Sequence, residues 1–170
     1  MGFIFLRLKI IFFRVIGFIS IQERLIKKIN YLDNNYFFYT PNYLNNYRAL
    51  TFLTKEPDTI NWIKSFEKNK VFYDIGANIG LYSVFASKEM KALSYAFEPS
   101  ILNLELLYKN ITINKLNNLI SIIPISLTET NQVSQFKLSN LDKGGALSAF
   151  DVNYDQFGKK LTLVSLVLEL

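Results

Sequence analysis

The residues best suited to chemistry in this chain lie together in one short stretch, Val71 to Ser83. An apolar run leads into an acidic residue, Asp74, and a turn with the spacing Gly76-x-Asn78-x-Gly80 follows before a helix-like segment begins. A strand, a glycine turn and a helix N-terminus in this order place backbone N–H groups around a nucleotide-like ligand. The stretch therefore predicts a ligand site at the carboxyl end of a strand.

The acid and the asparagine of this turn distinguish between classes of ligand. A dinucleotide turn of the G-x-G-x-x-G type keeps a glycine where the backbone approaches a pyrophosphate. Here that place is taken by Asn78, a residue type that tolerates positive φ. The carboxylate of Asp74 would repel a pyrophosphate and attract a cation. S-adenosylmethionine carries a sulfonium and an ammonium, so the turn favours this cofactor and leaves a dehydrogenase as a distant alternative.

A simpler interpretation of the same turn stays open. The carboxylate of Asp74 could only cap the helix that follows, and the glycines could only form a tight turn.

A second acidic residue strengthens the cofactor hypothesis. The segment Leu93 to Phe97 is typical of a buried strand and is followed directly by Glu98. Glu98 follows Gly76 by about twenty residues, the spacing at which nucleotide-binding folds place the acid that binds ribose hydroxyls. Taken alone, Glu98 would be interpreted as a solvated acid in a strand-to-helix loop. Together with the Asp74 turn, it is better interpreted as a ribose contact.

The elements that must position these residues alternate between strand and helix patterns. The sequence predicts helices over 57–67, 80–90 and 100–114, a third strand over 119–125 and the start of a hairpin over 132–138. The helix over 100–114 is expected to face the sheet with Ile101, Leu104, Leu107 and Ile111. Ser126, directly after the third strand, is a candidate for an adenine contact. This alternation predicts an α/β fold with a parallel sheet and flanking helices.

Several motifs together resemble the FkbM family of S-adenosylmethionine-dependent methyltransferases. They are DIGANIGLYS, AFEPS, the spaced asparagines of NLELLYKNITIN, the KEP that precedes the first strand and the GGALS that follows the third. The resemblance covers roughly residues 48–148. It implies a Rossmann-like methyltransferase fold, S-adenosylmethionine as methyl donor, and a small-molecule or glycan hydroxyl as acceptor, as in polysaccharide modification.

The resemblance also implies roles for individual residues. The methionine end of the cofactor would be lined by Asp74, Gly76, Ala77, Asn78 and Gly80. Glu98 would bind the ribose, and Glu56 is a further candidate for the amino group. No residue is assigned as general base.

The chain departs from the family pattern at its C-terminal end. Family members continue into a fourth strand that typically ends in an acidic D-x-E/D-G motif, and this sequence reaches Leu170 without one. We therefore expect the C-terminal half of the fold to be incomplete. A non-catalytic, truncated remnant of such an enzyme is an alternative to an active methyltransferase.

Composition excludes several classes of protein and site. Half of the residues are hydrophobic and 15% are aromatic, which excludes an intrinsically disordered chain. Cysteine and histidine are both absent, so disulfides, thiolate or imidazole metal sites and an imidazole base are excluded. We predict no metal site, and the lack of cysteine is consistent with a cytoplasmic, reducing location.

The net charge of +5 is concentrated at the N-terminus. Residues 1–28 contain six basic residues and one acidic residue, and the remainder contains thirteen of each sign. A basic groove for nucleic acid across the folded domain is therefore not supported, and we expect no nucleic-acid partner.

We expect three regions along the chain. Residues 1–29 form a basic, apolar segment predicted to be helical, in which Arg7, Lys9 and Arg14 interrupt any membrane span. It could lie on an anionic membrane surface, giving peripheral contact through residues 1–28, or pack on the domain. Residues 30–47 are an Asn- and Tyr-rich linker or loop around a short aromatic strand expected at Tyr36 to Tyr39. Its aromatics pack over the core or, alternatively, stack on sugars or bases. Residues 48–170 form the partial methyltransferase domain. The remaining alternative to a methyltransferase is a membrane-peripheral interaction protein whose basic N-terminal segment is the functional part.

Overall fold

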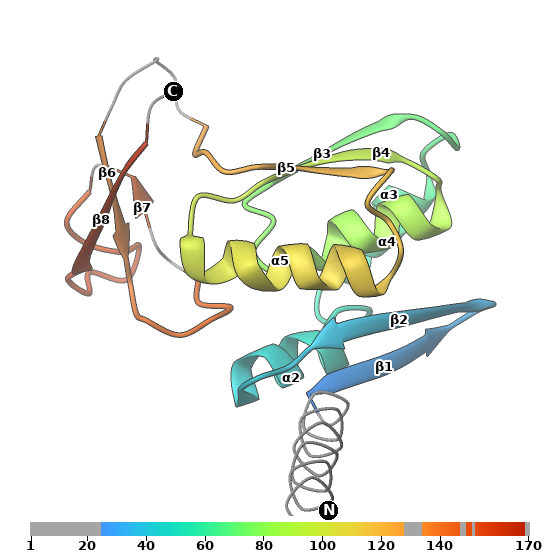
Figure 1. Ribbon diagram of the computed structural model, residues 1–170, viewed down its shortest axis with the longest axis horizontal. Coiled ribbons are helices and arrows are strands. Elements are labelled where there is room, and N and C mark those ends of the chain that lie inside the picture. Colours follow the sequence, from blue (N-terminus) through green and yellow to red (C-terminus); the bar gives the residue numbers. More distant parts are fainter. Residues whose placement is uncertain (1–24, 128–133, 147–148, 151, 169–170) are drawn as a thin grey trace, which may run out of the picture.

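The computed structural model describes residues 25–127, 134–146, 149–150 and 152–168. The elements form a hairpin, a helix-covered parallel sheet and an antiparallel sheet (Figure 1). The strands are β1 (Ile26–Tyr31), β2 (Asn34–Tyr39), β3 (Val71–Ile75), β4 (Leu93–Phe97), β5 (Ile120–Ile123), β6 (Ser134–Leu138), β7 (Ala149–Phe150) and β8 (Thr162–Leu168). The helices are α2 (Tyr43–Thr51), α3 (Pro57–Lys64), α4 (Leu81–Glu89) and α5 (Ile101–Ile113).

The parallel sheet positions the predicted ligand turn. Its strand order is β3-β4-β5, with α4 connecting β3 to β4 and α5 connecting β4 to β5. Parallel neighbours joined by crossover helices in this order make up one half of a doubly wound Rossmann-like sheet. The prediction of an α/β fold with a parallel sheet and flanking helices is confirmed.

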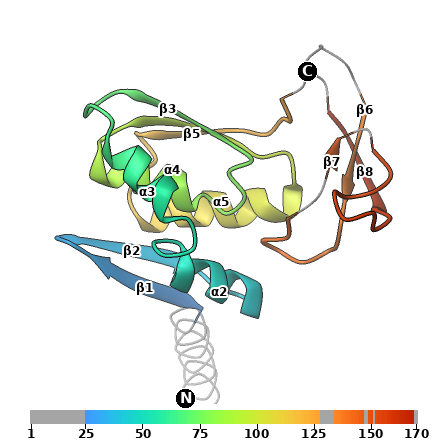
Figure 2. The ribbon, with the colours of Figure 1, turned by 180° about the vertical axis from the view of Figure 1, so that it is seen from behind.

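The helices cover only one face of this sheet among the described residues. Both α4 and α5 lie on the same side of β3, β4 and β5 (Figure 2). Burial alternates along β3, where Phe72 and Asp74 are buried, whereas Tyr73 and Ile75 are 61% and 66% exposed. Parallel sheets are usually covered on both faces, so the open face is an unusual feature of this fold.

The N-terminal hairpin contains the short aromatic strand that was expected over 36–39, which is part of β2, but its other strand and the helix that follows it were not expected. Residues 26–29 belong to β1, which pairs antiparallel with β2, and residues 43–47 begin α2. Alternate residues of β2, Tyr36 and Phe38, are fully buried against Phe52 and Phe85. These two aromatics therefore pack over the core, as one of the two interpretations predicted, whereas Tyr43 is 82% exposed. Residues 1–24, for which a helix was predicted, lie outside the described residues.

The face of α5 that meets the sheet also differs from expectation. Ile101 was predicted to face the sheet but is 58% exposed. The buried side instead includes two asparagines, Asn103 and Asn110, beside Leu107 and Ile111. Asn110 donates through Nδ2 to the Ile79 carbonyl oxygen at 2.8 Å and accepts from the Tyr39 N–H at 2.8 Å. Burial of a polar side chain is compensated here by bonds to backbone groups.

Candidate cofactor-binding site

Two adjoining hollows open at the carboxyl ends of β3 and β4. We name the first the Glu98 hollow; it has a volume of about 290 Å³ and includes Glu98, Ser126 and Phe136 in its lining. The second, the Arg48 hollow, has a volume of about 330 Å³ and includes Arg48 and Asp74. The two hollows share four lining residues: Ile75, Gly76, Asn78 and Ala146. Ligands of open α/β sheets bind outside the carboxyl ends of the strands, which is where both hollows lie.

The turn between the hollows has the backbone geometry that the sequence suggested. Gly76 has a φ of +77°, and a Cβ added there would meet no atom within 4 Å, so the backbone is open to the site. Asn78 has a φ of +52°, the left-handed conformation for which asparagine was expected. The N–H groups of Gly76 and Ala77 both donate to the Phe97 carbonyl oxygen at 2.9 Å. These bonds tie the turn to the end of β4.

Glu98 is buried and is held by three N–H donors. Its Oε2 accepts from the Asn78 N–H at 2.7 Å, and its Oε1 accepts from the Ser100 N–H at 2.8 Å and from Asn103 Nδ2 at 3.3 Å. Burial raises the pKa of Glu98, and the three hydrogen bonds oppose this shift. Each carboxylate oxygen has two acceptor sites, so Oε2 retains one for a further donor such as a ribose hydroxyl.

Asp74 faces the other hollow and also binds the protein. Its Oδ2 accepts from the Ser83 N–H at 2.9 Å and from Ser83 Oγ at 2.5 Å. These bonds cap the first turn of α4, which is the simpler role considered for this residue. Its Oδ1 accepts no hydrogen bond within the described part of the chain, and the residue lines the Arg48 hollow. Burial raises the pKa of Asp74 and the Ser83 bonds oppose the shift.

The other predicted site residues divide into those that line a hollow and one that does not. Ala77 and Glu56 line the Arg48 hollow, and Ser126 lines the Glu98 hollow. Gly80 lines neither of them. A Cβ on Gly80 would lie 2.4 Å from Leu107 Cδ1, so this glycine allows α4 and α5 to approach closely.

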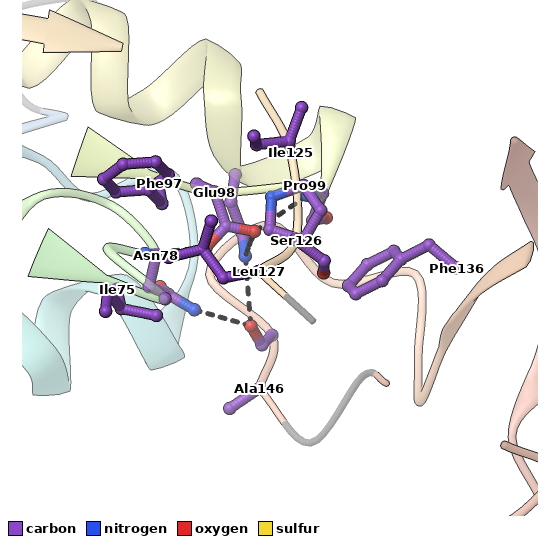
Figure 3. Close-up of a pocket in the computed structure, with 14 residues that line it drawn as sticks. Ile75, Asn78, Phe97, Glu98, Pro99, Ile125, Ser126, Leu127, Phe136 and Ala146 are labelled. Carbon is purple, nitrogen blue, oxygen red and sulfur yellow. Dashed lines mark hydrogen bonds between the residues drawn. The ribbon is translucent and has the colours of Figure 1, made fainter. Parts of the chain in front are cut away.

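A segment distant in sequence completes the site. We call residues 143–146 the strap; Gly145 and Ala146 line the Glu98 hollow, where Ala146 lies near Asn78 (Figure 3), and Ala146 also lines the Arg48 hollow. The Gly145 carbonyl oxygen accepts from Asn78 Nδ2 at 2.7 Å and from Asn103 Nδ2 at 3.2 Å. The Gly144 N–H donates to Asn103 Oδ1 at 2.9 Å, and Arg48 Nε donates to the Gly144 carbonyl oxygen at 2.9 Å.

Sequence reasoning did not assign functional roles to Arg48, Asn103 or Phe136. Phe136 reaches from β6 toward Pro99 and Ser126 and adds an aromatic wall to the Glu98 hollow (Figure 3). The asparagines spaced along α5 were a signal for Asn103. The GGA of the strap was a signal for the segment that Arg48 contacts. Neither signal showed that these segments meet.

The described residues contain neither of two further kinds of site. They include no group of three or more acidic side chains arranged to hold a metal ion. No helix in the described ranges is long and apolar enough to cross a membrane.

Comparisons with known proteins give weak similarities only. No known protein family matches the chain, and no curated protein matches it. Among solved structures, TYW2 of M. jannaschii in complex with AdoMet is 20% identical, with a TM-score of 0.42 over 58% of this chain and 42% of that one. Precorrin-6y C5,15-methyltransferase of Geobacter metallireducens is 21% identical, with a TM-score of 0.39 over 52% and 44%. The tRNA m1G37 methyltransferase of M. jannaschii is 26% identical, with a TM-score of 0.41 over 61% and 30%. The chain spans less than half the length of each, and similarities of this size establish neither a family nor an activity.

Proposed function

We propose that this chain is an S-adenosylmethionine-dependent methyltransferase domain of the FkbM type. The observation that carries the proposal is the pair of adjoining hollows around the Gly76 turn, each with a buried carboxylate, Glu98 in one and Asp74 in the other. A ligand with a nucleoside at one end and a charged amino acid at the other matches this division. The adenosine would occupy the Glu98 hollow and the methionine the Arg48 hollow.

The chemistry of the Glu98 hollow suits an adenosine. Glu98 would accept a hydrogen bond from a ribose hydroxyl through the remaining acceptor site of Oε2. The apolar side chains of Phe97, Ile125 and Phe136 offer surfaces for the adenine ring. The hydroxyl of Ser126 stands at the same wall and would meet the polar edge of the base.

The Arg48 hollow suits the charged end of the cofactor. Asp74 Oδ1 and the carboxylate of Glu56 would face the ammonium group. Bound S-adenosylmethionine supplies an electrophilic methyl group on its sulfonium. The protein's part is to hold donor and acceptor in line and to accept the proton that the acceptor hydroxyl loses. With histidine absent, that base is a carboxylate, a lysine or a tyrosine.

The acceptor we propose is a hydroxyl of a sugar, glycan or other small metabolite. Support comes from the FkbM resemblance of the turn, of Glu98 and of the strap, and it is an analogy at the level of the family. The absence of excess positive charge outside residues 1–28 argues against an RNA acceptor. Radiolabelled methyl transfer to a panel of glycans, with a tRNA pool as the competing acceptor, tests this part of the proposal.

Calorimetry with S-adenosylhomocysteine tests the cofactor assignment. We expect measurable binding to the full chain and about tenfold weaker binding to Glu98→Gln, because a charge-assisted hydrogen bond is worth about 1.5–3 kcal/mol. Glu67→Gln is the matched control, since Glu67 is exposed and pairs only with the neighbouring Lys70. No heat and no thermal shift with the unaltered chain would overturn the proposal. Binding without transfer to any acceptor would instead favour the non-catalytic remnant.

A further inference from the structure

Arg48 is a basic residue whose guanidinium is only partly used by the described part of the protein. It lies on α2, is partly buried and lines the hollow that also contains Asp74 and Glu56. Its Nε is used by the strap, through the bond to the Gly144 carbonyl oxygen at 2.9 Å. Its two terminal nitrogens make no hydrogen bond or ion pair within the described residues. Burial lowers the pKa of Arg48, and the nearby carboxylate of Glu56 opposes that shift.

The charges around this hollow come in matched numbers. Arg48 and Lys55 are basic, and Glu56 and Asp74 are acidic. No ion pair joins these four side chains in the described structure, although the carboxylate of Glu56 lies near enough to Arg48 to affect its pKa. A site for a simple anion or a simple cation would not need both signs. An α-amino acid group, which has an ammonium and a carboxylate on one carbon, needs both.

We propose that the Arg48 hollow recognises a zwitterionic amino acid group and that Arg48 binds its carboxylate through the two terminal guanidinium nitrogens. This inference rests on the proposed function, because the amino acid would be the methionine part of the cofactor. A guanidinium presents its N–H groups in a planar fork that matches the two oxygens of a carboxylate. The ammonium would then lie toward Asp74 Oδ1 and Glu56.

The same guanidinium links ligand recognition to the strap. Arg48 Nε holds the Gly144 carbonyl oxygen, and the next residue of the strap, Gly145, is held by Asn78 and Asn103 beside Glu98. The terminal nitrogens of Arg48 would therefore contact the carboxylate, while its Nε orders the wall of the hollow through the Gly144 carbonyl oxygen. Arg48 is accordingly a cofactor-binding and specificity-determining residue that favours ligands with the carboxylate over those without it.

Two ligands that differ only in the carboxylate test the inference. Calorimetry compares S-adenosylhomocysteine with its decarboxylated analogue, on the unaltered chain and on Arg48→Met. We expect the unaltered chain to prefer S-adenosylhomocysteine by about tenfold or more, which is the size of one charge-assisted pair. Arg48→Met is expected to lose this preference, so that it binds the two ligands with affinities within about twofold of each other.

A control variant separates carboxylate binding from an effect on the strap. Lys143→Met removes the ion pair between Lys143 and Glu105, which fastens the strap to α5, and leaves Arg48 in place. We expect it to keep the preference for the carboxylate. Arg48→Lys keeps the charge but not the planar fork of N–H groups, so we expect it to show an intermediate preference for the carboxylate. It replaces Arg48→Met in the test if that variant is too unstable to measure.

Different experimental outcomes would overturn this inference and the proposed function. Equal affinity of the unaltered chain for the two ligands would overturn the inference and leave the cofactor assignment intact. So would an equal loss of both affinities in Arg48→Met and Lys143→Met, which would show that Arg48 acts through the strap alone. Binding of neither ligand by the unaltered chain would overturn the proposed function itself.

Discussion

At the scale of single residues, two buried carboxyls couple the fold to the protonation state of the site. Burial raises the pKa of Asp74 and of Glu98 above their unfolded values. Each group therefore contributes stability that is fully present below its unfolded pKa and is lost as the pH rises through its folded pKa. The ionised forms destabilise the fold at neutral pH and are the forms that the proposed cofactor contacts use. Function and stability are opposed at these positions.

This opposition predicts contrary pH trends for binding and for folding. As the pH falls through the raised pKa of Glu98, we expect the affinity for S-adenosylhomocysteine to fall and the contribution of Glu98 to stability to rise. Glu98→Gln should reduce both trends and leave the part that the titration of Asp74 contributes. Calorimetry and urea unfolding between about pH 7 and about pH 4 measure the two quantities. If affinity and stability instead both fall as the pH falls, and do so equally in Glu98→Gln, this account is contradicted.

Two glycines of one turn predict different consequences of the same substitution. Gly76→Ala places a methyl group in the hollow and imposes positive φ on alanine, which costs about 1–2 kcal/mol of unfolding free energy and weakens cofactor binding. Gly80→Ala imposes the same strain and also drives a methyl group against Leu107 Cδ1. We expect it to cost about 1–3 kcal/mol more through overpacking, with a smaller effect on the affinity of the folded protein. Denaturant unfolding and calorimetry on both variants separate the two effects. Equal stabilities of the two variants would argue against close packing at Gly80.

At the scale of elements, buried asparagines of α5 join three parts of the chain. Asn110 binds the Ile79 carbonyl oxygen and the Tyr39 N–H, and Asn114 binds both backbone groups of Phe37. Asn103 binds Glu98 and the strap. A helix face of leucines could pack on the sheet, but it could not satisfy these backbone groups of the turn and hairpin.

The Asn110 bonds predict a large effect of a small substitution. Asn110→Ala removes the hydrogen bond to the buried Ile79 carbonyl oxygen and the one that the side chain accepts from the part-buried Tyr39 N–H, so we expect a loss of about 2–4 kcal/mol in the free energy of unfolding. Asn117→Ala is the control, because Asn117 is exposed and bonds only to Thr112 at the end of the helix; we expect a change within about 0.5 kcal/mol. Urea unfolding measures both. Similar small changes in the two variants would show that Asn110 does not hold α5 to the hairpin.

At the scale of the whole molecule, charge and exposed apolar surface are distributed unevenly. The open face of the parallel sheet contains Tyr73 and Tyr95, whose rings stack with centroids 5.6 Å apart. The excess positive charge is confined to residues 1–28, which are also rich in apolar side chains. The first feature follows from helices that cover one face. For the second, Lys27 and Lys28 belong to β1, and the other four basic residues of this segment lie outside the described residues.

The N-terminal charge predicts how the full chain responds to membranes. We expect co-sedimentation with vesicles that contain anionic lipid and little with neutral vesicles, because each basic residue near an anionic surface contributes about 1 kcal/mol. Replacing Arg7, Lys9 and Arg14 with glutamine should reduce recovery with anionic vesicles strongly, whereas replacing the exposed Lys159 and Lys160 should not. Equal recovery of both variants would argue against peripheral contact through this segment.

The sequence by itself determined the local chemistry of this protein. The strand, turn and helix around Asp74 and the acid after the second strand follow from periodicity and from the φ values that Gly76 and Asn78 can adopt, all within about twenty residues. Only the tertiary structure decided which remote groups complete the site. Arg48, Asn103 and residues 143–146 meet because backbone donors and acceptors of one segment are satisfied by side chains of another, and local patterns contain no record of such pairing. For the same reason the sequence predicted the aromatic strand within β2 but not β1 or its pairing with β2, since a strand is defined by its partner as much as by its own residues.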